Sequence, residues 1–155
     1  LPAPIEEVFP FFADAHNLQR LTPPWLHFEV LTPAPIPMKP GTLIDYKLRM
    51  RFIPIRWQSE ITAWEPPHRF VDEQRRGPYK LWHHLHTFES LDGGTLVKDR
   101  VNYLVPGGWM FDRLFVRRDI RKIFDYRKKV LAKTFGEGKV PGTSGDSMRP
   151  TEHPA

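Results

Sequence analysis

Between Gly41 and Phe52 the sequence alternates, residue by residue, between apolar and charged side chains. One set of alternate positions is apolar and consists of Ile44, Tyr46, Leu48, Met50 and Phe52, whereas the other is charged and consists of Asp45, Lys47, Arg49 and Arg51. A period of two is typical of a β-strand that buries one face and exposes the other, as strands of antiparallel sheets do. The segment therefore predicts an antiparallel sheet with one apolar face.

Five more runs have this period and lie at 28–32, 55–64, 70–75, 79–91 and 95–105. Turn-forming residues separate them, among them Pro66-Pro67, Gly77-Pro78 and Asp92-Gly93-Gly94. Runs that follow one another through short turns form a meander, so we predict six strands in sequence order.

Helical patterns flank these strands. Residues 5–13 predict a short helix with a kink at Pro10, and a second short helix follows Asp14. Residues 109–135 predict a long helix, since apolar residues recur with helical spacing at Val116, Ile120, Ile123, Phe124, Val130 and Leu131. Gly136 would end it. We predict one α+β domain over residues 1–136 and a disordered tail over 137–155.

The apolar face of such a sheet must be covered, and one long helix is the main element available to cover it. A helix is about 10 Å wide and strands lie about 4.8 Å apart, so a curved sheet that grips one helix leaves a hollow. We therefore expect a cavity for a hydrophobic small molecule, although each lining residue has core packing as its alternative. The apolar residues expected to line it are Phe28, Tyr46, Leu48, Met50, Trp57, Ile61, Trp82, Phe88, Val97, Val101, Tyr103, Ile120 and Phe124.

The last predicted hairpin carries polar residues on its inner face. A two-residue turn at Asp92-Gly93 pairs His86 with Asp99, and it also pairs His84 with Val101 and Trp82 with Tyr103. A three-residue loop would shift this register by one residue. We adopt the two-residue turn because it matches the apolar faces of the two strands.

In this register His84, His86, Asp99 and Tyr103 form a polar patch within an apolar wall. Three roles remain open for the patch: a structural His–Asp hydrogen bond, orientation of the polar end of a ligand, and acid/base catalysis by His86 held by Asp99. His84 and His86 also have a spacing that suits metal binding. The sequence indicates no third ligand, so we predict neither a metal nor another cofactor.

Positive charge dominates the chain, which has a formal net charge of +5 and a pI of about 9.6. Much of it lies on the predicted long helix, at Arg113, Arg117, Arg118, Arg121, Lys122, Lys128, Lys129 and Lys133. Such a face is usually solvated, and peripheral contact with an anionic membrane is the alternative. The pattern predicts no specific nucleic-acid binding, because aromatic residues do not interleave with the charges.

The sequence does not indicate a membrane-spanning, secreted, nucleotide-binding or serine-hydrolase protein. No apolar run approaches the roughly 18 residues of a membrane span, cysteine is absent, and no secretory leader is evident, so we expect a cytoplasmic protein. Nucleotide-binding glycine loops and the serine-hydrolase motif are also missing. Whether the protein is a monomer or a homodimer stays open.

Several strings also carry a family resemblance, which covers roughly residues 2–136. They are Pro4-Ile-Glu-Glu-Val-Phe9, Asn17-Leu-Gln-Arg-Leu-Thr-Pro-Pro-Trp25, Ile61-Thr-Ala-Trp-Glu-Pro-Pro67, Gly77-Pro-Tyr79, Trp82-His-His-Leu-His-Thr-Phe-Glu89 and Gly94-Thr95 with Asp99 and Tyr103. The chain resembles the START-like, or SRPBCC, superfamily of helix-grip proteins, and most closely its small bacterial ligand-binding members described as polyketide cyclase/dehydrase-like.

The resemblance implies a helix-grip fold with a seventh strand before the first helix. It also implies binding of a lipid or another hydrophobic or aromatic molecule, which we expect to occur without catalysis. The alternative that it implies is a lyase-type cyclase or dehydratase that acts on a poly-ketone or aromatic precursor, for which His86 and Asp99 are the candidate catalytic residues. The superfamily is functionally diverse, so its fold does not decide between these functions.

Overall fold

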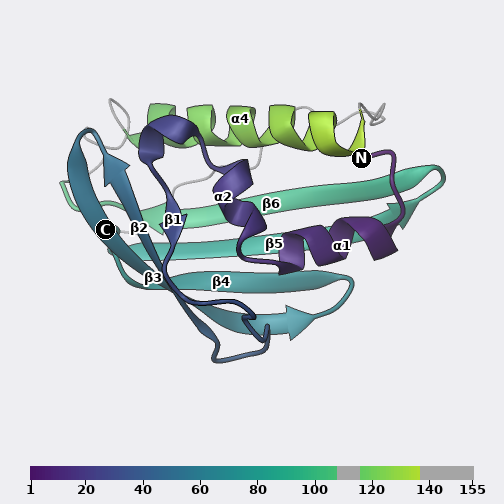
Figure 1. Ribbon diagram of the computed structural model, residues 1–155, viewed down its shortest axis with the longest axis horizontal. Helices are drawn as coiled ribbons and strands as arrows, with labels where there is room; N and C mark the ends of the chain where they lie inside the picture. Colours follow the sequence, from purple (N-terminus) through teal and green to yellow (C-terminus); the bar gives the residue numbers. More distant parts are fainter. Residues whose placement is uncertain (108–115, 137–155) are drawn as a thin grey trace, which may run out of the picture.

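The computed structural model describes residues 1–107 and 116–136. Their six strands form one antiparallel sheet in sequence order, which confirms the predicted meander. The strands are β1 (Glu29–Val30), β2 (Leu43–Met50), β3 (Ile53–Glu65), β4 (Arg69–Arg76), β5 (Leu81–Leu91) and β6 (Gly94–Leu104), and the helices are α1 (Ile5–Ala13), α2 (Asn17–Leu21), the 3₁₀-helix η1 (Pro24–Leu26) and α4 (Arg117–Phe135). Figure 1 shows the sheet curving around α4, with α1 and α2 beside it. The predicted α+β helix-grip class is confirmed.

β2 follows its alternating sequence as far as Met50, and its inward side chains Ile44, Tyr46 and Leu48 are buried. Phe52 departs from the prediction, because its side chain is 97% exposed and does not continue the apolar face. Arg51 and Phe52 form the tip between β2 and β3, with φ angles of +49° and +72°. A tight hairpin turn that matches the strand twist requires positive φ at both central residues, and this turn directs Phe52 away from the sheet.

The turn between β5 and β6 sets the register of the last hairpin. Leu91 pairs with Gly94, so Asp92 and Gly93 alone form the turn. His86 therefore lies opposite Asp99, and Trp82 lies opposite Tyr103. The register predicted from the two-residue turn is confirmed.

α4 spans the sheet and presents its apolar stripe to it. Ile120 and Leu131 are buried, and the Gly136 N–H donates to the Ala132 carbonyl at 2.8 Å where the helix ends. The predicted helix began at residue 109, and its segment 109–115 lies outside the described residues, as does the tail predicted over 137–155. Among the helices that the structure describes, none combines the length and apolarity needed to cross a membrane.

α1 packs against β5 and β6 and covers that end of the sheet. Pro10 lies inside α1 but is exposed, and the buried side chains are Ile5, Val8, Phe9 and Phe12. Phe9 packs against Phe88 of β5 with ring centroids 5.1 Å apart. The aromatic packing explains how one short helix can hold this end of the sheet together.

The expected seventh strand is not among the elements of the described residues. Leu1 instead exchanges two backbone hydrogen bonds with Thr95 at the start of β6, at 2.9 and 2.8 Å. The Thr95 hydroxyl also donates to the Ala3 carbonyl at 2.8 Å. These three bonds attach the first residues of the chain to the β6 edge of the sheet.

Candidate functional site

A cavity of about 920 Å³ lies between the concave face of the sheet, α4 and the segment from α1 to η1. Its size falls within the range of roughly 300–1,000 Å³ that is usual for small-molecule sites. The lining includes exposed side chains such as Trp25 and Phe52, so the cavity reaches the surface of the described part of the chain. Most of the remaining wall is apolar or aromatic.

The structure brings many of the predicted residues together around this cavity. Those that line it are Phe28, Tyr46, Leu48, Met50, Trp57, Ile61, Trp82, His84, His86, Ile120 and Phe124. The other predicted residues lie elsewhere. Phe88 and Val97 pack in the core cluster beneath α1, and Val101 and Tyr103 pack in a cluster with Val116 at the other end of the sheet.

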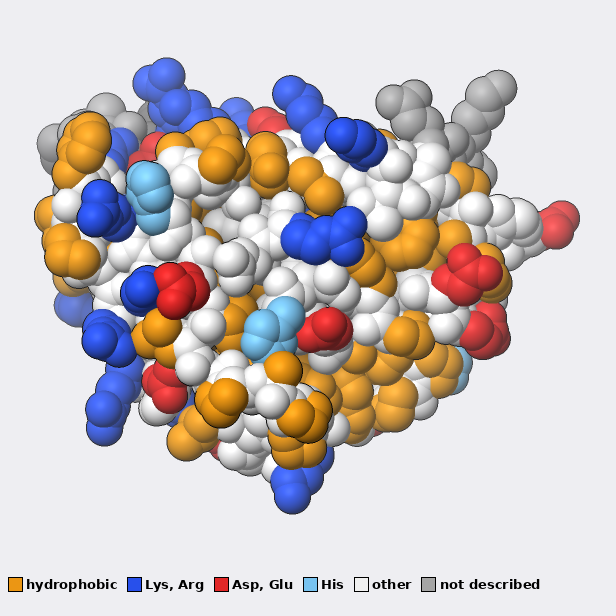
Figure 2. Space-filling model, viewed as in Figure 1, with side chains coloured by type: hydrophobic (Ala, Val, Ile, Leu, Met, Phe, Trp, Pro, Cys, Tyr) orange, Lys and Arg blue, Asp and Glu red, His pale blue; other side chains and the backbone are white. Residues whose placement is uncertain are grey.

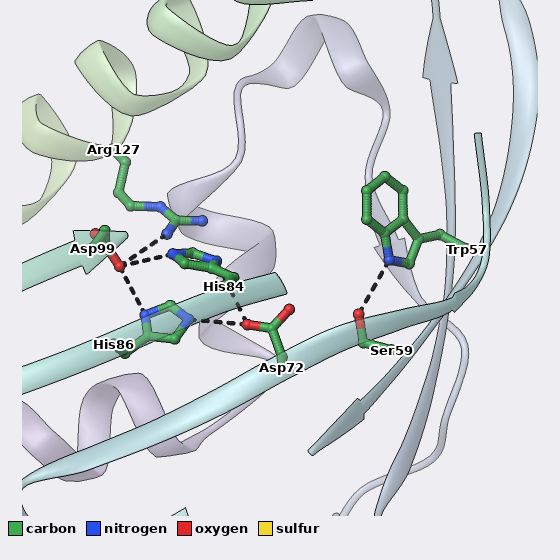
Figure 3. Close-up of polar contacts among 7 residues, drawn as sticks. All are labelled: Trp57, Ser59, Asp72, His84, His86, Asp99 and Arg127. Carbon is green, nitrogen blue, oxygen red and sulfur yellow. Dashed lines mark hydrogen bonds and ion pairs between the residues drawn. The ribbon is translucent and has the colours of Figure 1, made fainter. Parts of the chain in front are cut away.

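A buried polar cluster is held by three adjacent strands. β4 supplies Asp72, β5 supplies His84 and His86, and β6 supplies Asp99, as Figure 3 shows. Asp72 pairs with His84 across β4 and β5, and His86 pairs with Asp99 across β5 and β6. Side chains two residues apart on a strand share a face, so all four point toward the same side of the sheet.

Each carboxylate in the cluster contacts both histidines. The His84 Nε2–H donates to Asp99 Oδ1, and the His86 Nε2–H donates to Asp72 Oδ2, both at 3.0 Å. His86 Nδ1 lies 2.8 Å from Asp99 Oδ1, although off the direction of a straight hydrogen bond, and His84 Nδ1 lies 3.5 Å from Asp72 Oδ2. The two imidazole rings therefore lie between two carboxylates.

Aromatic packing fixes the two imidazoles. Their ring centroids are 3.7 Å apart, and the His86 ring stacks on Phe70 at 4.1 Å. The ring of Phe124 from α4 lies 5.8 Å from that of His84. Both histidines are more than nine-tenths buried, so neither ring can turn freely.

Burial and charge move the pKa values of the two histidines in opposite directions. Burial would lower the pKa of His86, but hydrogen bonds and charge from Asp72 and Asp99 outweigh it and raise that pKa above its usual value. Burial lowers the pKa of His84, and the nearby positive charge of His86 lowers it further, in spite of the two carboxylates. Between these two pKa values, His86 carries a positive charge and His84 is neutral.

The carboxylates of Asp72 and Asp99 remain ionised because neighbouring basic side chains lower their pKa values. Burial alone would raise the pKa of Asp99, but hydrogen bonds and charge from His84 and His86 hold it well below its usual value. Burial also opposes ionisation of Asp72, and His84, His86 and Arg127 together lower its pKa. The cluster is thus a set of mutually stabilised charges in an apolar wall.

Arg127 is a member of this site that the sequence interpretation did not include. It projects from α4 toward the cluster, is buried, and places Nη1 3.9 Å from Asp99 Oδ1 (Figure 3). Its guanidinium carbon also lies 5.0 Å from the centre of the Phe124 ring. Arg127 continues the apolar stripe formed by Ile120, Phe124 and Leu131, and this spacing is a signal that could have identified it.

Asp72 was missed as well. It occupies the same alternate positions as Phe70 in the predicted strand 70–75, so the period of that strand could have placed it on the inner face. Tyr103, which the prediction assigned to the polar patch, packs instead against the rings of Tyr79 and Trp82.

A second polar group lies on the β2 and β3 part of the cavity wall. The Trp57 Nε1–H donates to Ser59 Oγ at 3.1 Å, and both residues line the cavity. Tyr46 lies nearby, and burial together with the charge of Asp72 raises the pKa of its phenol. Tyr46 is therefore a neutral hydroxyl group throughout the physiological pH range.

Most basic side chains of α4 lie outside the cavity, although Lys122 and Arg127 are part of its lining. Arg118, Arg121, Lys122, Lys128, Lys129 and Lys133 are exposed. Figure 2 shows Lys and Arg side chains projecting along the edge of the molecule where α4 lies. Arg113, which was predicted to belong to this face, lies outside the described residues.

Comparisons with known proteins agree with this architecture. Residues 1–127 match the family model described as "Polyketide cyclase / dehydrase and lipid transport". Among curated proteins, none matches the chain.

Solved structures with the same fold include protein CV1439 from Chromobacterium violaceum, which is 16% identical with a TM-score of 0.68 over 89% of this chain and 93% of that one. Protein Ms6760 from Mycobacterium smegmatis is 18% identical with a TM-score of 0.64 over 86% and 85%. A protein from Arthrobacter aurescens is 16% identical with a TM-score of 0.65 over 86% and 82%. These likenesses support the fold, and the match over residues 1–127 shows that the chain belongs to the polyketide cyclase/dehydrase and lipid transport family.

Proposed function

We propose that this protein binds a hydrophobic or aromatic small molecule in the cavity between the sheet and α4, without converting it chemically. The observation that carries the proposal is a cavity of about 920 Å³ whose lining is mainly apolar and aromatic. Ligand sites commonly combine such a wall with a few fixed polar groups. The name of the family, which includes lipid transport, is consistent with this function.

The polar groups of the wall suggest how a ligand would be oriented. His86 and Arg127 line the cavity near one another, whereas Tyr46 and Ser59 lie on the β2 and β3 part of the wall. A carbonyl or hydroxyl group on the ligand can accept hydrogen bonds from any of these side chains. We therefore propose an elongated or ring-shaped apolar ligand with an oxygen-bearing group at one end.

The test is thermal unfolding of the full chain with a panel of fatty acids, aromatic polyketides and quinones, supported by native mass spectrometry. A ligand present at 100 times its Kd should stabilise the folded state by about 2.7 kcal/mol. Leu48 lines the cavity and Leu43 lies on the opposite face of the same strand, so Leu48→Trp should abolish the stabilisation and Leu43→Trp should retain it. Equal stabilisation of both variants would place the ligand outside the cavity.

Acid/base catalysis is a second candidate, favoured by the position of His86. This residue lines the cavity, is held by two carboxylates and has a raised pKa, so it could protonate a carbonyl oxygen or a departing hydroxyl group. We expect His86→Gln to abolish turnover of a bound poly-β-ketone while leaving its affinity largely intact. Unchanged turnover would exclude His86 from catalysis.

A further inference from the structure

Asp72, His84 and His86 come together at the wall of the cavity. One potential ligand atom from each of the three lies within 4.8 Å of the other two. Two imidazoles and one carboxylate are a donor set for divalent transition metals. We propose that these three residues bind one divalent metal ion of the Zn²⁺ and Fe²⁺ class at the wall of the cavity.

The distances within the triad suit a shared ion. Asp72 Oδ2 lies 3.0 Å from His86 Nε2 and 3.5 Å from His84 Nδ1. Ligand atoms bound about 2.1 Å from one metal ion are separated by roughly 2.9 Å in octahedral and roughly 3.4 Å in tetrahedral geometry. The two distances from Asp72 to the histidines therefore match those between ligands of one ion.

The opposite edges of both imidazoles face a second carboxylate. Asp99 Oδ1 lies 3.0 Å from His84 Nε2 and 2.8 Å from His86 Nδ1. Metal-binding histidines usually direct the ring nitrogen that does not bind the ion toward a carboxylate, which holds a proton there and leaves the other nitrogen free to bind. Asp99 forms this hydrogen bond with His84 Nε2 and lies beside His86 Nδ1, so the structure assigns it as a positioning residue, for His84 above all.

The contact between His84 and Asp72 indicates where positive charge is needed. The Nε2–H of His84 is directed to Asp99, so its Nδ1 carries a lone pair that faces the Asp72 carboxylate oxygen at 3.5 Å. Two electron-rich atoms facing each other in a buried site repel unless a cation lies near both.

The triad also has an open side. Asp72, His84 and His86 line the cavity, whereas Asp99 lies behind them and does not. An ion held by three protein ligands would therefore have coordination positions directed into the cavity, where water or an oxygen atom of a ligand could bind. Mg²⁺ and Ca²⁺ prefer sites made entirely of oxygen ligands, so two imidazoles disfavour them.

The experiment measures binding of Zn²⁺ to chelator-stripped full-length protein at pH 7.5 by calorimetry, with Mg²⁺ as the negative control. We expect one tightly bound Zn²⁺ per chain and release of protons on binding. Asp72→Asn and His84→Gln should each weaken binding at least about 100-fold, and Asp99→Asn should weaken it about 10–100-fold. His83→Gln removes a histidine of the same strand that is not part of the triad, so this control should bind like the wild type.

Co²⁺ gives a readout on the wild-type protein that does not require any variant to fold. Binding to the triad should produce visible absorption bands of a nitrogen- and oxygen-ligated ion, and added Zn²⁺ should remove them. Absence of Zn²⁺ and Co²⁺ uptake by the wild type would overturn the proposal, as would equal affinity of Asp72→Asn, His84→Gln and the His83→Gln control. The assay contains no lipophile, so its result is independent of whether the cavity binds one.

Discussion

The Asp99 carboxylate contacts His84, His86 and Arg127, so Asp99→Asn is the most informative single substitution in the buried cluster. The carboxylate lies within 3.0 Å of both histidines and 3.9 Å from Arg127, and little of it is exposed. Removing one member of a buried charge pair typically costs about 3–5 kcal/mol, because the remaining charges lose their compensation. We expect a loss of this size at pH 6, which corresponds to a fall in Tm of roughly 10 °C.

The loss should also depend on pH in a defined direction. Because the folded state raises the pKa of His86, protonation of His86 contributes stability below its unfolded pKa of about 6.5, and that contribution disappears as pH rises through the higher folded pKa. Much of this contribution comes from Asp99. The difference in stability between wild type and Asp99→Asn should therefore be largest near pH 6 and smaller near pH 9.

Urea denaturation at both pH values measures this difference directly. Asp125→Asn is the matched control, because Asp125 is exposed on α4 and its substitution should change stability by less than about 0.5 kcal/mol. A loss below about 1 kcal/mol for Asp99→Asn at pH 6 would refute the argument that this carboxylate stabilises the buried charges. An equal loss at pH 6 and pH 9 would refute the assigned charge of His86.

Three further predictions concern other parts of the molecule. Arg127→Met should destabilise the protein by about 3 kcal/mol in urea denaturation, because it leaves Asp99 short of positive charge, whereas Arg121→Met on the exposed face of α4 should be nearly neutral. Phe9→Ala should cost about 3–5 kcal/mol through the cavity it opens under α1, and Phe52→Ala at the exposed hairpin tip should cost almost nothing; similar losses for both would contradict the packing described. If the basic face of α4 binds anionic membranes, the protein should co-sediment with phosphatidylserine vesicles at low salt and be released near 0.5 M salt, whereas binding that salt does not weaken would exclude this electrostatic mechanism.

The sequence was sufficient to predict the sheet, because burial of one face leaves a period of two that can be read without knowing the neighbours. It also predicted the pairing of His86 with Asp99, since a two-residue turn determines every pair in a hairpin. The apolar stripe of α4 at Ile120 and Leu131 was also predicted, because burial of one helix face leaves apolar residues at helical spacing. These features depend on local periodicity and turn geometry.

Other features depend on how the elements meet in three dimensions. Strand alternation identified the inner face but not which part of it α1 would cover, so Phe88 and Val97 were expected in the cavity and lie in the core instead. Arg127 was not recognised because charged residues on a helix are usually solvated. The contact of Asp72 with the histidines was not predicted, because it depends on the register of β4 against β5, which no short turn in the sequence determines.

The two-residue turn at Asp92 and Gly93 also limits how this chain can change during evolution. One residue inserted or deleted there would exchange the faces of one strand relative to the other, bringing Lys98 and Arg100 inward and directing Asp99 into solvent. Relatives that retain the buried cluster should therefore retain the length of this turn even where its sequence differs. Length variation should instead accumulate at segments that carry no part of the cluster, such as the exposed tip between β2 and β3.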